Sequence, residues 1–499
     1  MVMNKMRILK AFVLPALCLS MVSCSLDFAT GPNIPNIPLD GDVPPSQNDG
    51  DRFDEIVEND FIKTSVENVS TFSIDADGAS YAYMRKQLND GQSVLPVSVR
   101  IEEYLNYFTF DYDEPTGDHT VAINGEVGDC PWNPDHKLIR LGIKGKSLDA
   151  SQMPAANYVF LIDVSGSMNA YDKLPLLKEG LVTLTERLNP QDRVSIVTYS
   201  GNVKLLLEST LASDAETIKM AISSLGASGS TAGGAAMKMA YEEALANYIK
   251  GGNNRVIMGT DGDFNVGVTS TQELVAMVQE YASLGIYLTV CGFGTGNLND
   301  GMMEQISNKG NGTYEYIDSE DELSKVFVNE RSKFQAVAND SKVQVTFDKD
   351  KVDSYRLIGY ENRMMSNNDF EDDSKDAGEI GAGQTITALY EIVPGKKFDE
   401  GGALAVFDFR YKKALGEESI PLTMDVTGSD TLDETPTELR FAAGVAAYGM
   451  ILRDSKYKGT ADLDMAYDLV GERLSFDPYG YRAQLRELIQ MAKDLKVED

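Results

Sequence analysis

An acid and two hydroxyl residues alternate in the segment Asp163-Val164-Ser165-Gly166-Ser167, and their side-chain oxygens could bind a metal ion. The segment directly follows an apolar run, residues 158–162, that we predict to be a strand. At the carboxyl end of a strand in a parallel sheet the chain turns sharply, so the three side chains can converge on one point. By itself the pattern is weak, because Asp and Ser also cap helices and form turns.

Two further polar residues are predicted to lie at the same edge of the sheet. Thr231 lies in a run of small residues, 228–234, directly before a predicted helix, and Asp261 follows the predicted strand 255–259. Together with the first loop they supply carboxylates and hydroxyls but no thiolate or imidazole. This donor set favours a hard cation, Mg²⁺, Ca²⁺ or Mn²⁺, over zinc or copper.

The five residues resemble the metal-ion-dependent adhesion site of the von Willebrand factor A (VWA) family, written D-x-S-x-S, then T, then D. The resemblance implies that Ser165 and Ser167 bind the cation directly and that Thr231 binds it directly or through water. It implies that Asp163 and Asp261 hold coordinated waters. It also implies an open coordination position for an Asp or Glu side chain of a protein partner.

Loop residues beside the cation would decide which partner fits. For each of them the alternative is an ordinary solvated loop residue, since loops at this edge are expected to be polar in any case. The candidates for this rim are Asn169, Tyr171, Ser228, Asp263, Asn265, Thr295 and Asn297.

Alternating strands and helices between residues 157 and 334 would position these loops. The predicted strands are residues 158–162, 194–199, 255–259, 286–291 and 314–317, and the predicted helices are residues 174–188, 214–225, 235–248, 273–284 and 321–334. Ser-x-x-Glu pairs at 213/216, 270/273 and 319/322 support three of the helix starts. The pattern predicts an α/β domain over residues 151–334 with a doubly wound, mostly parallel sheet.

The remainder of the chain shows other patterns. Residues 51–150 predict an N-terminal α+β extension, residues 335–436 a β-sandwich-like module, and residues 437–499 a helical segment. In motifs spread over most of residues 60–495, the chain is similar to an uncharacterised group of bacterial envelope proteins. These have an extension, a central VWA domain and a C-terminal domain of unknown function.

The N-terminus predicts export and lipid anchoring. Residues 1–23 combine a basic start with a short apolar run, which is typical of a signal peptide, and Met21-Val22-Ser23-Cys24 resembles a bacterial lipobox with Cys24 as the lipidated residue. Residues 24–50 hold prolines 32, 35, 38, 44 and 45 and predict a tether to the membrane. We therefore expect a lipid-anchored envelope protein at the outer membrane, on either its periplasmic or its surface face. An ordinary secreted protein is the alternative.

Charge and composition reduce the number of function classes that fit the sequence. The net charge is −32, and removal of the signal peptide, which has three basic and no acidic residues, would make it −35. This argues against nucleic acid as a partner, since such binding requires basic surface. Besides a protein-binding module, a Mg²⁺-dependent hydrolase using Asp163 and Asp261, or a structural protein stabilised by metal, is consistent with the site. We predict a non-enzymatic role because there is no G-x-x-x-x-G-K-[ST] loop, and because His119 and His136 lie outside the VWA domain.

Overall fold

The computed structural model describes residues 50–75, 77–149, 151–229, 233–262, 271–428, 437–471 and 476–498. The chain divides into two compact units, residues 1–46 and 47–499, and the described residues all belong to the second. The predicted signal peptide, Cys24 and nearly all of the predicted tether lie outside the described residues. Within the described part of the chain, no helix combines the length and the apolar character needed to cross a membrane.

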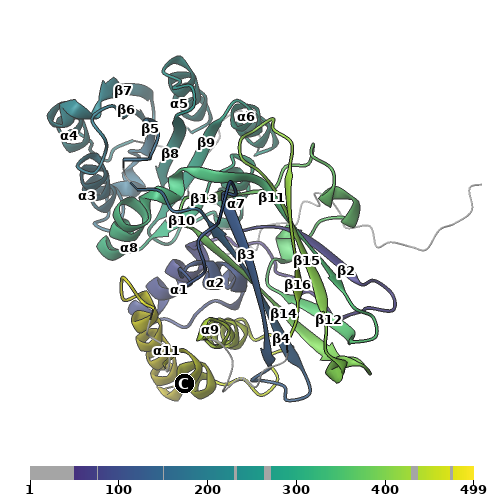
Figure 1. Ribbon diagram of the computed structural model, residues 1–499. Helices are drawn as coiled ribbons and strands as arrows, with labels where there is room; N and C mark the ends of the chain where they lie inside the picture. Colours follow the sequence, from purple (N-terminus) through teal and green to yellow (C-terminus); the bar gives the residue numbers. More distant parts are fainter. Residues whose placement is uncertain are drawn as a thin grey trace, which may run out of the picture. The chain divides into compact units, whose positions relative to one another are not determined.

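A six-stranded sheet occupies the centre of the predicted VWA domain (Figure 1). Its order is β10-β9-β8-β5-β6-β7, and all neighbours are parallel except the edge pair β6 and β7. The sequence did not predict the edge strand β7, whose side chains are mostly half-buried and show no clear alternation. The strands are β5 (Ala156–Asp163), β6 (Arg193–Tyr199), β7 (Val203–Leu211), β8 (Asn253–Thr260), β9 (Ile286–Phe293) and β10 (Tyr314–Ile317).

Helices cover both faces of this sheet, which confirms the predicted doubly wound α/β fold. The helices α3 (Leu174–Thr185), α4 (Ala215–Ser223) and α8 (Glu320–Ser324) pack on one face, and α5 (Gly234–Ala246), α6 (Thr271–Ser283) and α7 (Asp300–Lys309) pack on the other. The helix α7 is short and polar, and the sequence analysis did not predict it.

The helix starts agree with the capping prediction in one place and differ in another. The Ser319 hydroxyl accepts a hydrogen bond from the Glu322 backbone N–H at 3.2 Å, as predicted. At α4 the cap is Asp214, which accepts from the Thr217 backbone N–H, so Ser213 is not the cap there. Ser270 lies outside the described residues. The predicted helix 321–334 is divided into α8, a π-helical turn and a 3₁₀ turn.

Two antiparallel sheets face each other across a second core. One has the order β1-β12-β14-β4-β3, and the other has the order β13-β11-β15-β16, with β2 paired to β11. Phe72, Ile139 and Tyr390 are buried together with Val343 and Phe407 in this core. The strands are β1 (Ile62–Lys63), β2 (Val69–Ser73), β3 (Val121–Asp129), β4 (Lys137–Gly145), β11 (Ala336–Phe347), β12 (Val352–Ile358), β13 (Gly378–Gly381), β14 (Thr385–Pro394), β15 (Ala405–Lys412) and β16 (Ile420–Val426).

Strands from the predicted N-terminal extension and from the predicted β-rich module therefore share sheets. Strand β4 pairs with β14 over eight residues, and β2 pairs with β11 over five. Alternation along a strand shows which face is buried but not which strand pairs with it. The residue boundaries 150/151, 334/335 and 436/437 stay predictions.

The helices outside the VWA domain form a third core from both ends of the described chain (Figure 1). Tyr81 and Tyr104 from the N-terminal part are buried beside Phe441 and Leu488 from the predicted helical segment. The helices are α1 (Ala79–Asn89), α2 (Ile101–Asn106), α9 (Thr437–Arg453), α10 (Leu463–Gly471) and α11 (Tyr481–Glu498). The short turns are Pro96–Ser98, Gly166–Asn169, Ala212–Asp214, Lys325–Asn329, Arg331–Phe334, Glu361–Arg363, Asn367–Phe370 and Phe398–Glu400.

Candidate functional site

The loop after β5 brings together the first three predicted ligands. Asp163 is the last residue of β5, and its Oδ1 accepts a hydrogen bond from the Ser165 backbone N–H at 2.8 Å, which closes a tight Asx turn. The Ser165 and Ser167 Oγ atoms are hydrogen-bonded at 3.0 Å. Asp163 and Ser165 are buried whereas Ser167 is exposed, so the set lies at the sheet edge with one side toward solvent.

Asp261 follows β8, the strand that pairs with β5, and it is also buried. Burial raises the pKa of Asp163 to about 6, the Ser165 hydrogen bonds oppose that rise, and the Asp261 carboxylate adds to it. Thr260 Oγ1 donates to Asp163 Oδ2 at 3.5 Å. Two carboxylates with two hydroxyls form an all-oxygen donor set, whose chemistry fits Mg²⁺, Ca²⁺ or Mn²⁺.

The small-residue loop that contains Thr231 begins beside the first loop. The Ser228 backbone N–H donates to the Val164 carbonyl at 2.7 Å, and the Gly166 N–H donates to the Gly229 carbonyl at 3.0 Å. Thr231 itself lies outside the described residues. The described part of this loop, Ser228 and Gly229, therefore contacts the loop after β5, as the predicted site requires.

Five of the seven predicted rim residues belong to the described chain, and all five are exposed: Asn169, Tyr171, Ser228, Thr295 and Asn297. Tyr171 is the most exposed large hydrophobic residue of the protein's described part, at 83%. The Asn297 loop packs against the Asp261 loop, because a Cβ on Gly262 would lie only 2.7 Å from the Asn297 carbonyl oxygen. Asp263 and Asn265 lie outside the described residues.

Two residues near the site were not predicted. Lys173, just before α3, donates from Nζ to Asp261 Oδ2 at 2.9 Å, and both side chains are buried. Asp51 Oδ1 accepts hydrogen bonds from the Gly296 and Leu298 backbone N–H groups at 2.6 and 2.9 Å, so the N-terminal segment holds the rim loop. These contacts span long sequence distances and leave no periodic signal.

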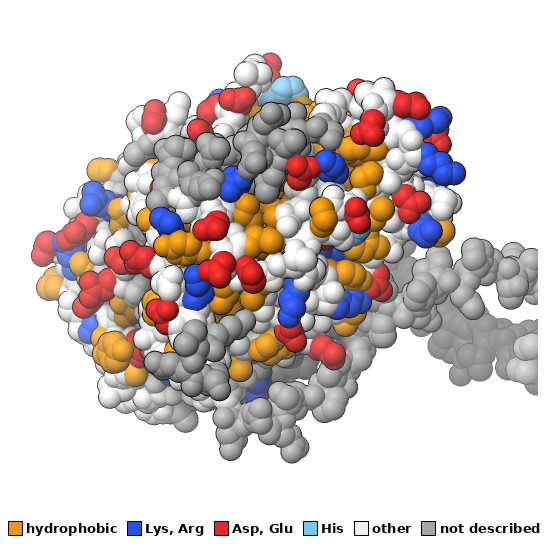
Figure 2. Space-filling view, turned by 90° about the horizontal axis from the view of Figure 1, so that it is seen from below, with side chains coloured by type: hydrophobic (Ala, Val, Ile, Leu, Met, Phe, Trp, Pro, Cys, Tyr) orange, Lys and Arg blue, Asp and Glu red, His pale blue; other side chains and the backbone are white. Residues whose placement is uncertain are grey.

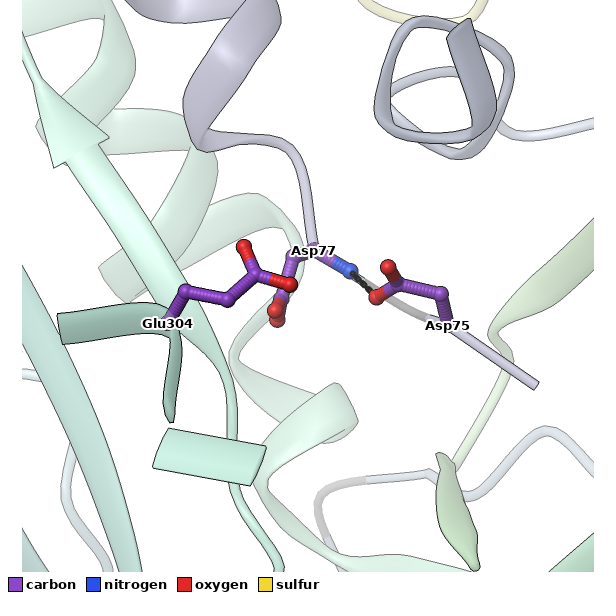
Figure 3. A group of neighbouring side chains, drawn as sticks. All are labelled: Asp75, Asp77 and Glu304. Carbon is purple, nitrogen blue, oxygen red and sulfur yellow. Dashed lines mark hydrogen bonds between the residues drawn. The ribbon is translucent and has the colours of Figure 1, made fainter. Parts of the chain in front are cut away.

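A second group of acids lies away from the predicted site. Asp75 and Asp77 precede α1, Glu304 lies on α7, and one oxygen of each lies within 4.8 Å of the others (Figure 3). Arg363 provides a positive charge among them: its Nη2 lies 3.1 Å from Asp75 Oδ1, 3.7 Å from Asp77 Oδ2 and 3.4 Å from Glu304 Oε1. This acidic cluster therefore holds an arginine that links the N-terminal part, the VWA domain and the loop after β12.

The buried Glu102, on α2, should make the stability of the folded protein depend on pH. Burial raises its pKa to about 8, and Glu361 adds to the rise. The folded state thus keeps a proton that the unfolded state releases near pH 4.5, so stability should fall as the pH rises from about 5 to about 8. Glu102→Gln should remove up to about 1.4 kcal/mol per pH unit of this dependence in urea unfolding. Exposed Glu179→Gln is the control, and equal pH slopes for Glu102→Gln and the wild type would contradict the prediction.

Comparison with known proteins identifies the family of this chain. Residues 157–329 match the von Willebrand factor type A domain, residues 47–140 match a family described as von Willebrand factor, and residues 332–495 match the C-terminal region of the uncharacterized protein YfbK. YfbK of Escherichia coli (strain K12) is 37% identical over 466 residues, which cover 88% of this chain and 81% of YfbK. The chain belongs to the YfbK family.

Other similar proteins match a smaller part of the chain and have lower sequence identity. The uncharacterized protein sll0103 of Synechocystis sp. is 27% identical over 225 residues, covering 44% of this chain and 51% of that protein. A solved structure described as von Willebrand factor type A from Catenulispora acidiphila covers 76% of this chain and 91% of its own, with 16% identity and a TM-score of 0.43. The family membership of the chain rests on YfbK and on the matched domains.

Proposed function

We propose that this member of the YfbK family is a metal-dependent protein-binding protein. A divalent cation, Mg²⁺ or else Ca²⁺ or Mn²⁺, would be held by Asp163, Ser165, Ser167, Thr231 and Asp261. The observation that carries the proposal is the convergence of Asp163, Ser165 and Ser167 in one loop, beside Asp261, which follows the neighbouring strand β8. When bound, the cation would supply a coordination position for a carboxylate from outside the chain.

The residues of the chain would then prepare the site for that carboxylate. Ser165 and Ser167 would bind the cation with neutral oxygens, so they would leave part of its charge for an incoming acid. The cation would attract an Asp or Glu of a protein partner at short range, although the net charge of the whole chain is −32. The exposed rim residues, Tyr171 and Asn297 among them, would select among acidic partners.

The charged surface is consistent with a protein partner. On the face shown in Figure 2, the described Lys and Arg side chains are scattered among Asp and Glu and do not form a continuous basic stripe. We accordingly propose no nucleic-acid partner for this protein.

We further propose that the protein works in the cell envelope, lipid-anchored through Cys24 to the outer membrane. The support is the signal-like segment 1–23 and the lipobox-like sequence before Cys24. The adjoining proline-containing segment would let the folded unit reach a partner about 25–30 Å from the anchor. Adhesion and scaffolding of envelope assembly are both consistent with this placement.

The positions of the two histidines argue against hydrolysis with Ser167 as the nucleophile. His119 lies beside Tyr411, and His136 Nδ1 lies 2.5 Å from Glu391 Oε1, both in contact with the antiparallel sheets. Neither imidazole can therefore serve as a general base for Ser167.

The test is capture of envelope proteins on the immobilised protein with Mg²⁺ or with EDTA. A partner retained by wild type with Mg²⁺, and lost both with EDTA and with Ser165→Ala, is the expected result. Exposed Ser213→Ala, in the same domain, is the matched control and should retain the partner. Equal retention by all three proteins with and without metal would overturn the proposal.

A further inference from the structure

Lys173 is a buried cation fixed beside the proposed metal site. The residue is 7% exposed, and Nζ donates to Asp261 Oδ2 at 2.9 Å. The methylene chain crosses Gly294, which directly follows β9 and has φ +65°. A Cβ at Gly294 would lie 2.3 Å from Lys173 Cε, so this position has room for the lysine only because it is glycine.

The lysine changes the charge that a cation would meet. Asp163, Asp261 and Lys173 are buried at 0%, 1% and 7% exposure, so solvent screens their charges little. Two ionised carboxylates and one ammonium sum to −1. A divalent cation would bring these groups to +1, and only an added anion would bring them to zero.

We propose that Lys173 makes cation binding and anionic-ligand binding depend on each other. This inference rests on the proposed metal site and adds a property to it. The ammonium weakens binding of the cation alone, because like charges repel at short range in a buried site. A carboxylate ligand relieves the repulsion, so the partner's group is an anion and not a neutral amide. By reciprocity, the anion in turn strengthens the binding of the cation.

The coupling also gives the site a simple selectivity. Without a partner the cation is held weakly, and with an acidic partner both are held together. Lys173 is thus a specificity-determining residue that acts through its positive charge, with no contact to the partner required.

The experiment is calorimetric titration of the purified protein with Mg²⁺, in acetate, in acetamide and in neither, at matched ionic strength. Lys173→Met keeps the methylene chain, and Lys173→Gln keeps a hydrogen-bond donor for Asp261, so two variants lose the charge in different ways. Lys238→Met is the control, because this lysine on α5 is exposed and its ion-pair partner Glu242 lies on the same helix.

Both Lys173 variants should bind Mg²⁺ about tenfold more tightly than wild type when acetate is absent, and Lys238→Met should bind as wild type does. Acetate should strengthen Mg²⁺ binding more in wild type than in the Lys173 variants, and acetamide should not. Unchanged or weaker Mg²⁺ binding by folded Lys173 variants, or an equal acetate effect in all proteins, would overturn the coupling.

Failure of the proposed function can be distinguished from failure of the role proposed for Lys173. If wild type binds Mg²⁺ no better than Ser165→Ala does, the metal site is wrong, and the coupling is overturned with it. If wild type binds Mg²⁺ more tightly than Ser165→Ala does, and the Lys173 variants bind it as tightly as wild type does, only the role of Lys173 is wrong.

Discussion

Replacing Ser165 by alanine is expected to lower the affinity for Mg²⁺ about 100-fold or more. The change removes one proposed direct ligand and the hydrogen bond between the Ser165 and Ser167 hydroxyls at 3.0 Å. Loss of groups that only orient metal ligands already costs about 10–100-fold in affinity, and a direct ligand should cost at least as much. Asp163→Asn should give a loss of similar direction, because it removes a buried negative charge next to the cation.

Calorimetry on folded proteins measures this effect. The Ser165→Ala protein should stay folded, since losing one hydroxyl hydrogen bond costs only about 1 kcal/mol. Ser213→Ala should bind Mg²⁺ as wild type does. A Ser165→Ala protein with wild-type Mg²⁺ affinity would remove this serine from the proposed ligand set.

Arg363→Met is expected to lower the free energy of unfolding by about 3–5 kcal/mol, because it removes a cation from a group of buried carboxylates, although Arg100 still pairs with Glu304. Arg363 Nη2 lies within 3.7 Å of oxygens of Asp75, Asp77 and Glu304 and donates to Asn308 Oδ1 at 2.6 Å. Although burial opposes it, Arg100 and Arg363 hold the pKa of Glu304 below its ordinary value. The contacts join three parts of the folded unit, so the loss should affect the whole unit.

Urea unfolding at two pH values tests this explanation. A lowered pKa stabilises the fold above the unfolded pKa of Glu, and this contribution disappears as the pH falls. The difference between wild type and Arg363→Met should therefore be smaller at pH 4 than at pH 7. Exposed Arg187→Met should change the stability by less than about 0.5 kcal/mol. A loss under 1 kcal/mol for Arg363→Met at pH 7 would show that the cluster does not need this arginine.

The sequence was sufficient where a local pattern determines structure. Strands buried on both faces appear as continuous apolar runs, and for that reason β5 and β9 could be predicted. The convergence of Asp163, Ser165 and Ser167 could be anticipated because a parallel sheet places strand ends and loops at one edge. The start of α8 followed from the hydroxyl of Ser319.

What could not be predicted depends on contacts between distant segments. Strand β4 shows alternation, but nothing in it identifies β14, about 250 residues later, as its partner. Lys173 precedes a helix like many surface lysines, and only the fold places it against Asp261. The same holds for Arg363, whose acidic partners come from residues 75–77 and 304.

The location of the bound cation tests the central claim most directly. Crystals of the protein grown with Mn²⁺ should show an anomalous-scattering peak in contact with the Ser165 and Ser167 hydroxyls, near Asp163 and Asp261. The same crystals should show no Mn²⁺ among Asp75, Asp77 and Glu304, where Arg363 already lies. A peak only at that second cluster, or no peak at the serines in crystals saturated with Mn²⁺, would contradict the proposed metal site and the function built on it.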